Sequence, residues 1–242
     1  MKRYIFILVI MVVIILIKVF YVPQNRQISP VFFPPTDIPQ PSIAKPTKPP
    51  SYHLIKTAFV PQSPKKNWDQ PWQDACEEAA MLTVKYYYFN QSPNSSQIKT
   101  DLQSIFDYET SVNLTGDVNV SQIATISAAM FQLKPTVITD PTLAIFKQYL
   151  LRDIPVIVPA NGKILYKENN HFKSGGPWYH NLVVLGFDDS RQQFIVHDVG
   201  TQFGAYFRYS YSLLLEAIHD FPPGGPKENI NQGPKNVLVL VK

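Results

Sequence analysis

Apolar residues in the second part of the chain follow two spacings, one typical of helices and one typical of strands. Helical spacing predicts helices at about 75–88, 121–133, 142–152 and 210–219. Short apolar and β-branched runs predict strands at 135–139, 154–159, 179–187, 194–199 and 236–241. Because the helices begin first and the strands gather later, we expect an α+β fold with a mostly antiparallel sheet.

Two of these strands are joined by a short polar turn. Residues 188–191, Asp-Asp-Ser-Arg, separate the strand at 179–187 from the strand at 194–199, which predicts a hairpin. In such a hairpin the outer ends of the two strands lie side by side, so His180 and Asp198 should be neighbours. His197 should point away from Asp198, because strand side chains alternate between faces.

The beginning of the chain has a different pattern. Residues 4–22 are almost continuously apolar, with one interruption at Lys18, and a helix of this length covers about 28 Å of a bilayer core of ~30 Å. The run ends without the small residues of a signal-peptidase site, which favours an uncleaved anchor. Lys2 and Arg3 predict a cytoplasmic tip, so 1–22 is expected to be a cytoplasmic tip and transmembrane anchor, with the rest of the chain extracytoplasmic.

Proline marks the segment after the anchor. Residues 23–50 carry repeated prolines and predict an extended stalk. The remaining range, 51–242, is expected to be the folded domain. The chain is 45% hydrophobic and 13% aromatic, which is enough to form a core there.

The distribution of charge along the chain differs between these regions and argues against a nucleic-acid partner. The formal net charge of +4 comes from the first 50 residues, which contain six basic residues and one acidic residue. The rest of the chain is slightly acidic. A nucleic-acid-binding protein normally carries its basic surplus on the folded domain. We therefore expect no nucleic-acid partner.

Cys76 is the only cysteine in the chain. Asp74 and Glu77 have the spacing of a capping box, which would place Cys76 in the first turn of a helix. Backbone N–H groups and the helix dipole favour negative charge there, so a lowered thiol pKa is expected. A lone cysteine is more often a small buried apolar residue. However, an extracytoplasmic protein seldom keeps an unpaired thiol without a use for it, which favours a nucleophile.

Three further side chains could complete the site. Gln70 could donate a hydrogen bond to an oxyanion, His180 could take the thiol proton, and Asp198 could orient the imidazole. Each of these residues alone is more often structural. Their joint occurrence with Cys76 favours a catalytic arrangement.

Several other kinds of site lack the necessary residues. The chain has no zinc-ligand spacing such as H-E-x-x-H, no second cysteine for a thiolate cluster and no phosphate-binding glycine loop. We expect neither a metal nor a cofactor.

These motifs together resemble cysteine peptidase family C39, the bacteriocin-processing peptidases, and in particular their stand-alone relatives without a transporter. The resemblance covers about 61–242. It is carried by Gln70 six residues before Cys76-Glu77, an alanine-rich helix running into Tyr86-Tyr87-Tyr88, and the strand Ile154–Val158. The segments Tyr179–Asp188 and His197–Gly200 and the helix at 210–218 complete it.

The resemblance implies a papain-like fold and a thiol protease that hydrolyses peptide or protein substrates. Cys76 would be the nucleophile, His180 the general base, Asp198 the orienting acid and Gln70 the oxyanion donor. The double-glycine leader substrates of the transporter-linked members are not carried over, because this chain has no transporter domain and its anchor would point the site outward.

Two other classes of function are also compatible with these residues. One is a catalytically silent surface domain that binds a peptide or wall polymer, with Trp68, Trp72 and Trp178 lining a groove. The other is a transglutaminase-like or peptidoglycan-cleaving enzyme, since such enzymes also place Cys, His and Asp in this chain order.

Overall fold

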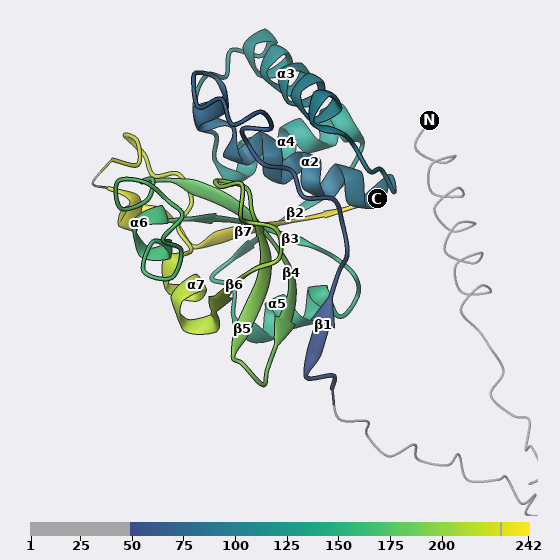
Figure 1. The fold of residues 1–242 in the computed structure, drawn as a ribbon, viewed down its shortest axis with the longest axis vertical. Helices are drawn as coiled ribbons and strands as arrows, with labels where there is room; N and C mark the ends of the chain where they lie inside the picture. Colours follow the sequence, from purple (N-terminus) through teal and green to yellow (C-terminus); the bar gives the residue numbers. More distant parts are fainter. Residues whose placement is uncertain (1–48, 228) are drawn as a thin grey trace, which may run out of the picture. The chain divides into compact units, whose positions relative to one another are not determined.

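The computed structural model describes residues 49–227 and 229–242. Its helices are α2 (Cys76–Tyr88), α3 (Ser95–Ser111), α4 (Val120–Phe131), α5 (Leu143–Leu150), α6 (Gly162–Leu165) and α7 (Tyr211–Ala217), with short 3-10 helices at Trp72–Asp74 and Ile230–Gln232. Its strands are β1 (Tyr52–Leu54), β2 (Lys134–Thr139), β3 (Val156–Ala160), β4 (His180–Asp188), β5 (Gln193–Asp198), β6 (Phe207–Ser210) and β7 (Asn236–Val241). The predicted α+β class is confirmed (Figure 1).

These strands form one sheet in the order β2-β7-β3-β4-β5-β6, and β1 pairs with the far end of β4. Every pair among the described strands is antiparallel. The predicted hairpin is confirmed, with Val183 of β4 opposite His197 of β5. Gly186 permits the pairing with β1, because a Cβ at this position would lie 2.3 Å from the carbonyl oxygen of His53.

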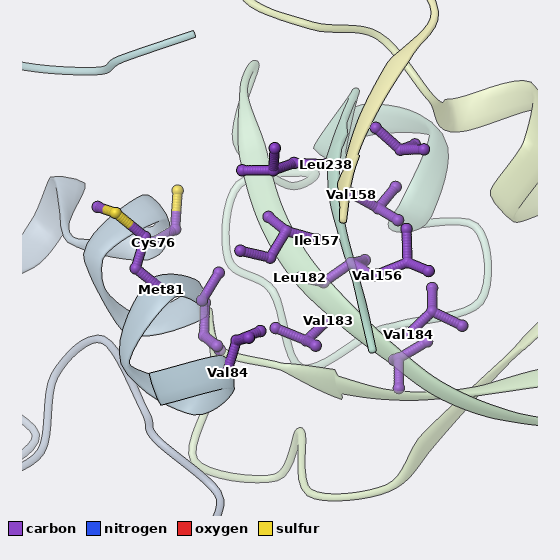
Figure 2. Packing of buried hydrophobic residues seen from close by; sticks show 14 of the residues in the cluster. Cys76, Met81, Val84, Val156, Ile157, Val158, Leu182, Val183, Val184 and Leu238 are labelled. Atoms are coloured by element: carbon purple, nitrogen blue, oxygen red, sulfur yellow. The ribbon is translucent and has the colours of Figure 1, made fainter. Parts of the chain in front are cut away.

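The central strand β4 is buried at all of its positions, which requires cover on both faces of the sheet. α2 packs on β4 and α4 on β2 and β7, whereas α5 packs on β3 and β4. Figure 1 shows α2, α3 and α4 grouped on one side of the sheet and α5 and α7 on the other. Figure 2 shows Met81 and Val84 of α2 facing the strand residues Ile157 and Val183. The covered sheet therefore forms the hydrophobic core.

Most predicted elements are present with ends shifted by one or two residues, but α3 was not predicted. Its buried residues Ile98, Leu102 and Ile105 have helical spacing, although polar residues dominate the rest of the segment. The side chain of Asn94 caps this helix by accepting from the backbone N–H groups of Ser96 and Gln97. The short strands β1 and β6 were also missed, because three or four residues carry too little pattern.

The predicted anchor, 1–22, and nearly all of the predicted stalk, 23–50, lie outside the described residues. In the part of the chain that the structure describes, no helix combines the length and the apolar character needed to cross a bilayer.

His197 lies on the opposite face of β5 from Asp198, as predicted. Its ring packs edge-on against Tyr206 at 4.5 Å and Phe59 at 5.3 Å between ring centroids. Burial lowers the pKa of His197 to about 4 from its ordinary value of 6.5, and the nearby backbone of Ala58 offsets only part of this effect.

This burial predicts a loss of stability in mild acid. Between pH 6.5 and pH 4 the unfolded chain binds a proton at His197 and the folded chain largely does not, so the free energy of unfolding decreases as the pH falls. His197→Leu removes this titration. Urea unfolding at pH 7 and pH 4.5 should show that the wild type loses up to about 3 kcal/mol more than the variant. Equal losses in the two proteins would contradict the prediction.

Candidate active site

Cys76 is the first residue of α2, and Ala75 alone separates it from the 3-10 helix Trp72–Asp74. The predicted capping box is wrong: Ala75 is the N-cap residue, and no side chain caps the helix. The reason is that both predicted partners are engaged elsewhere. The carboxylate of Asp74 accepts a hydrogen bond from Gln70, and that of Glu77 accepts from the backbone N–H of Val118.

The sulfur of Cys76 is buried and has two neighbouring polar groups. The thiol donates to Oε2 of Glu77 at 2.9 Å, and the side-chain amide of Asn181, on β4, approaches Sγ at 4.0 Å. Glu77 is itself fully buried. Its second oxygen, Oε1, accepts from the N–H of Val118 at 3.0 Å, which fixes the carboxylate beside the sulfur.

The electrostatic surroundings of Cys76 are the reverse of those expected. Burial, together with the charges of Glu77 and Asp117, raises the pKa of the Cys76 thiol well above its ordinary value. Burial and Asp117 also raise the pKa of Glu77. The prediction of a lowered thiol pKa is therefore wrong for this state of the protein, because the helix dipole is weaker than burial beside a carboxylate.

His180 and Asp198, at neighbouring ends of β4 and β5, are brought together as the hairpin requires. Nε2 of His180 lies 2.8 Å from Oδ1 of Asp198, and both side chains are almost completely buried. Burial opposes ionisation of Asp198. The charge of His180 and hydrogen bonds from His180, Tyr209 and the N–H of Gly200 outweigh it and hold the pKa of this carboxyl below its ordinary value.

The other oxygen of Asp198 is held by two residues that sequence reasoning missed. Oδ2 accepts from the side-chain amide of Asn169 at 2.9 Å and from the hydroxyl of Tyr209. Asn169 is fully buried, and its side-chain amide also donates a hydrogen bond to the Tyr209 hydroxyl. No local motif marks either residue, because both reach Asp198 from other elements of the fold.

The imidazole of His180 is also fixed by packing. The ring of Phe172 meets it edge-on at 5.2 Å between centroids. Gly200 also lies against the ring, because a Cβ at this position would come within 2.6 Å of Cε1 of His180. The hydrogen bonds of the described residues use only Nε2 of this ring, so Nδ1 is left for a proton from another group.

Gln70 is exposed, and its side-chain Nε2 donates to Oδ2 of Asp74 at 2.6 Å. None of the hydrogen bonds among the described residues joins Gln70 to Cys76. The side-chain nitrogen carries two hydrogens, and Asp74 uses one of them.

The structure thus forms the predicted pair of His180 and Asp198, while Cys76, the predicted nucleophile, contacts other residues. His180 and Asp198 are in contact, whereas no hydrogen bond in the described part of the chain links Cys76 to His180. Cys76 contacts Asn181, the residue that directly follows His180. Asn181 follows His180 on β4, so Cys76 lies at the end of the strand that carries His180, while the side chains of the two adjacent strand residues point to opposite faces.

A metal site is not formed in residues 49–227 and 229–242, since no group of three or more suitable side chains gathers there.

The hydrogen bond from Tyr209 to Asp198 predicts a measurable contribution to stability. Tyr209→Phe keeps the ring but removes one donor from a buried carboxylate, which should cost about 1.5–3 kcal/mol of unfolding free energy in urea. Tyr211→Phe is the matched control. The Tyr211 hydroxyl bonds Asp189, a more exposed carboxylate that also pairs with Lys147, so its loss should cost less than about 1 kcal/mol. Equal costs would contradict the special role of Tyr209.

One family of known proteins matches most of the folded domain. The model of the Peptidase_C39 like family matches residues 57–219. A solved structure from Bacillus anthracis, described as a candidate C39-like peptidase, is similar with a TM-score of 0.47 and 12% identity, covering 79% of this chain and 98% of that one. No curated protein matches the chain. Because the family match spans more than half of the chain and includes Cys76, His180 and Asp198, the chain belongs to the Peptidase C39-like family.

Proposed function

We propose that this chain is a papain-like cysteine peptidase that hydrolyses peptide bonds with Cys76 as nucleophile, His180 as general base and Asp198 as the orienting acid. The observation that carries the proposal is the buried His180–Asp198 pair, 2.8 Å between the two atoms, at the end of β4 that Cys76 contacts. Membership of a family of C39-like peptidases supports the same class of reaction.

In this reaction His180 begins neutral, with its Nε2–H donating to Asp198. The Cys76 sulfur turns toward His180 and gives its proton to Nδ1, which leaves a thiolate and an imidazolium. The thiolate attacks the carbonyl carbon of the substrate. The departing amine takes the proton from His180, and water then hydrolyses the thioester and releases the free thiol.

The negative oxygen that forms during attack needs hydrogen-bond donors. The backbone N–H of Cys76 is one of the first N–H groups of α2, which have no partner within a helix. The second hydrogen on Nε2 of Gln70 is the other proposed donor. The hydrogen bond from Gln70 to Asp74 fixes the orientation of this amide, and Gln70 itself is exposed.

Cys76→Ala tests the assignment of the nucleophile. The full-length variant should keep the far-ultraviolet circular dichroism of the wild type, yet lose at least about 10³-fold in kcat/KM on a peptide library and lose labelling by a thiol-directed inhibitor. Ser127→Ala, an equally buried small side chain on α4, should change neither readout. Hydrolysis that survives in Cys76→Ala would refute the proposal.

A second candidate is a catalytically silent domain that binds peptides or wall polymers. It is favoured by the contact of the Cys76 thiol with Glu77 in place of His180. Trp68 and Trp178 are partly exposed and available to a ligand, whereas Trp72 is buried against Phe106 and belongs to the core. This candidate requires that the wild type hydrolyse no member of the library.

We further propose that the apolar run at 4–22 anchors the chain in the cell membrane with the peptidase domain on the extracytoplasmic side. The support is the length of the run and the basic residues Lys2 and Arg3 before it.

This topology predicts how cells that express the full chain will fractionate. The protein should stay with the membranes through an alkaline carbonate wash, and protease added to intact spheroplasts should degrade the domain. A cytoplasmic protein of the same cells must survive that treatment as the control. Release by the wash, or protection from the protease, would contradict the proposed anchor or its orientation.

A further inference from the structure

Glu77 makes an unusual contact with the residue that precedes it. Side chains of adjacent helix residues normally diverge, yet Oε2 of Glu77 lies 2.9 Å from the sulfur of Cys76. This is possible because Cys76 is the first residue of α2, where the preceding turn of helix is absent. The proposed nucleophile thus starts its reaction with a carboxylate as hydrogen-bond acceptor.

The carboxylate of Glu77 is held from a second direction. The N–H of Val118 donates to Oε1 at 3.0 Å, and the carbonyl of Val118 accepts from the hydroxyl of Tyr179 at 3.1 Å. Tyr179 directly precedes His180. The position of Glu77 is therefore tied to the same segment that carries the proposed general base.

We propose that Glu77 is a catalytic residue of this site: it holds the Cys76 thiol in a neutral resting form, and the sulfur must leave Glu77 before it can give its proton to His180. The inference rests on the proposed function, in which Cys76 is the nucleophile. No atom is exchanged in the resting form, where the proton stays on Sγ and is shared with Oε2 through the hydrogen bond.

The physical basis is the repulsion between two negative charges in a buried place. Ionising Cys76 beside an ionised Glu77 would put two anions within 3 Å of one another without water between them, which low-dielectric surroundings make costly. The pair therefore avoids carrying two charges at neutral pH. The turn of the sulfur toward His180 relieves this repulsion and exchanges an acceptor that opposes the thiolate for an imidazolium that stabilises it.

Other charged and titratable groups around Cys76 act in the same direction or more weakly. Asp117, in the loop before α4, has a pKa raised to about 6 by burial and by Asp74, and it adds negative charge near the thiol above that pH. Glu78 on α2 makes the weakest of these contributions. From β4 and the residue before it, the groups near Cys76 are Asn181 and Tyr179.

The test measures the rate at which iodoacetamide alkylates Cys76 in the full-length protein, as a function of pH and without substrate. Glu77→Gln keeps the shape of the side chain and its bond from Val118 but removes the charge. The midpoint of the alkylation profile should fall by at least about one pH unit relative to the wild type. At a pH below the midpoints of both proteins, the variant should then react about tenfold faster. If Glu77→Gln changed only the access of iodoacetamide to the sulfur, the rate would change at every pH and the midpoint would stay the same.

Glu78→Gln is the matched control, because it removes the same charge from the next buried residue, which among the described hydrogen bonds makes none to the sulfur. Its midpoint should move by less than half as much. Equal shifts in the two variants, or no shift in Glu77→Gln, would overturn the proposal.

A measurement on the unaltered protein keeps the proposal testable if Glu77→Gln does not fold. The ultraviolet difference spectrum between the wild type and Cys76→Ala reports thiolate directly. It should show no thiolate at pH 7 and thiolate only at alkaline pH, whereas thiolate already present at pH 7 would overturn the proposal. Neither measurement uses hydrolysis, so its outcome is distinct from that of the Cys76→Ala test of the proposed function.

Discussion

The complete burial of β4 is the constraint on which the site depends. A strand covered on both faces has apolar side chains in its middle and polar ones near its ends, and β4 carries His180 and Asn181 at one end. Buried polar groups require partners, and here they come from separate elements: Asp198 from β5 for His180, and Cys76 from α2 beside Asn181. These two contacts thus follow from the way in which helices and strands cover the end of one strand.

Two buried carboxylates near this end of the sheet are stabilised in opposite ways. Asp198 receives hydrogen bonds from His180, Asn169, Tyr209 and the backbone of Gly200, so its charge is stable although water is excluded. Glu77 receives one backbone N–H and a thiol, and burial raises its pKa. The number of donors therefore decides the role: Asp198 can remain an anion that orients His180, whereas Glu77 favours a shared proton with Cys76.

The sequence predicted those parts of the molecule that depend on local spacing. The turn at 188–191 and the alternation on each side of it were enough to predict the hairpin, and with it the contact of His180 with Asp198. Asn169 and Tyr209 could not be predicted in the same way, because they reach Asp198 through tertiary contacts that no spacing encodes. α3 shows a different limit, since its few buried residues are separated by a largely polar sequence.

The thiol of Cys76 shows why a local rule can give the wrong sign. A helix N-terminus stabilises a negative charge by about 0.3–1 kcal/mol, whereas two unit charges 4 Å apart interact by about 4 kcal/mol at an effective dielectric constant of 20. A carboxylate in contact with the sulfur, together with burial, therefore outweighs the dipole, and the sequence gives no sign that Glu77 turns back toward Cys76 in place of capping the helix. The charge on this sulfur is decided by the neighbour that it faces. Glu77 opposes a thiolate at Cys76, and in the proposed reaction a protonated His180 stabilises it, so the direction of the Cys76 side chain separates the resting form of the site from the reactive one.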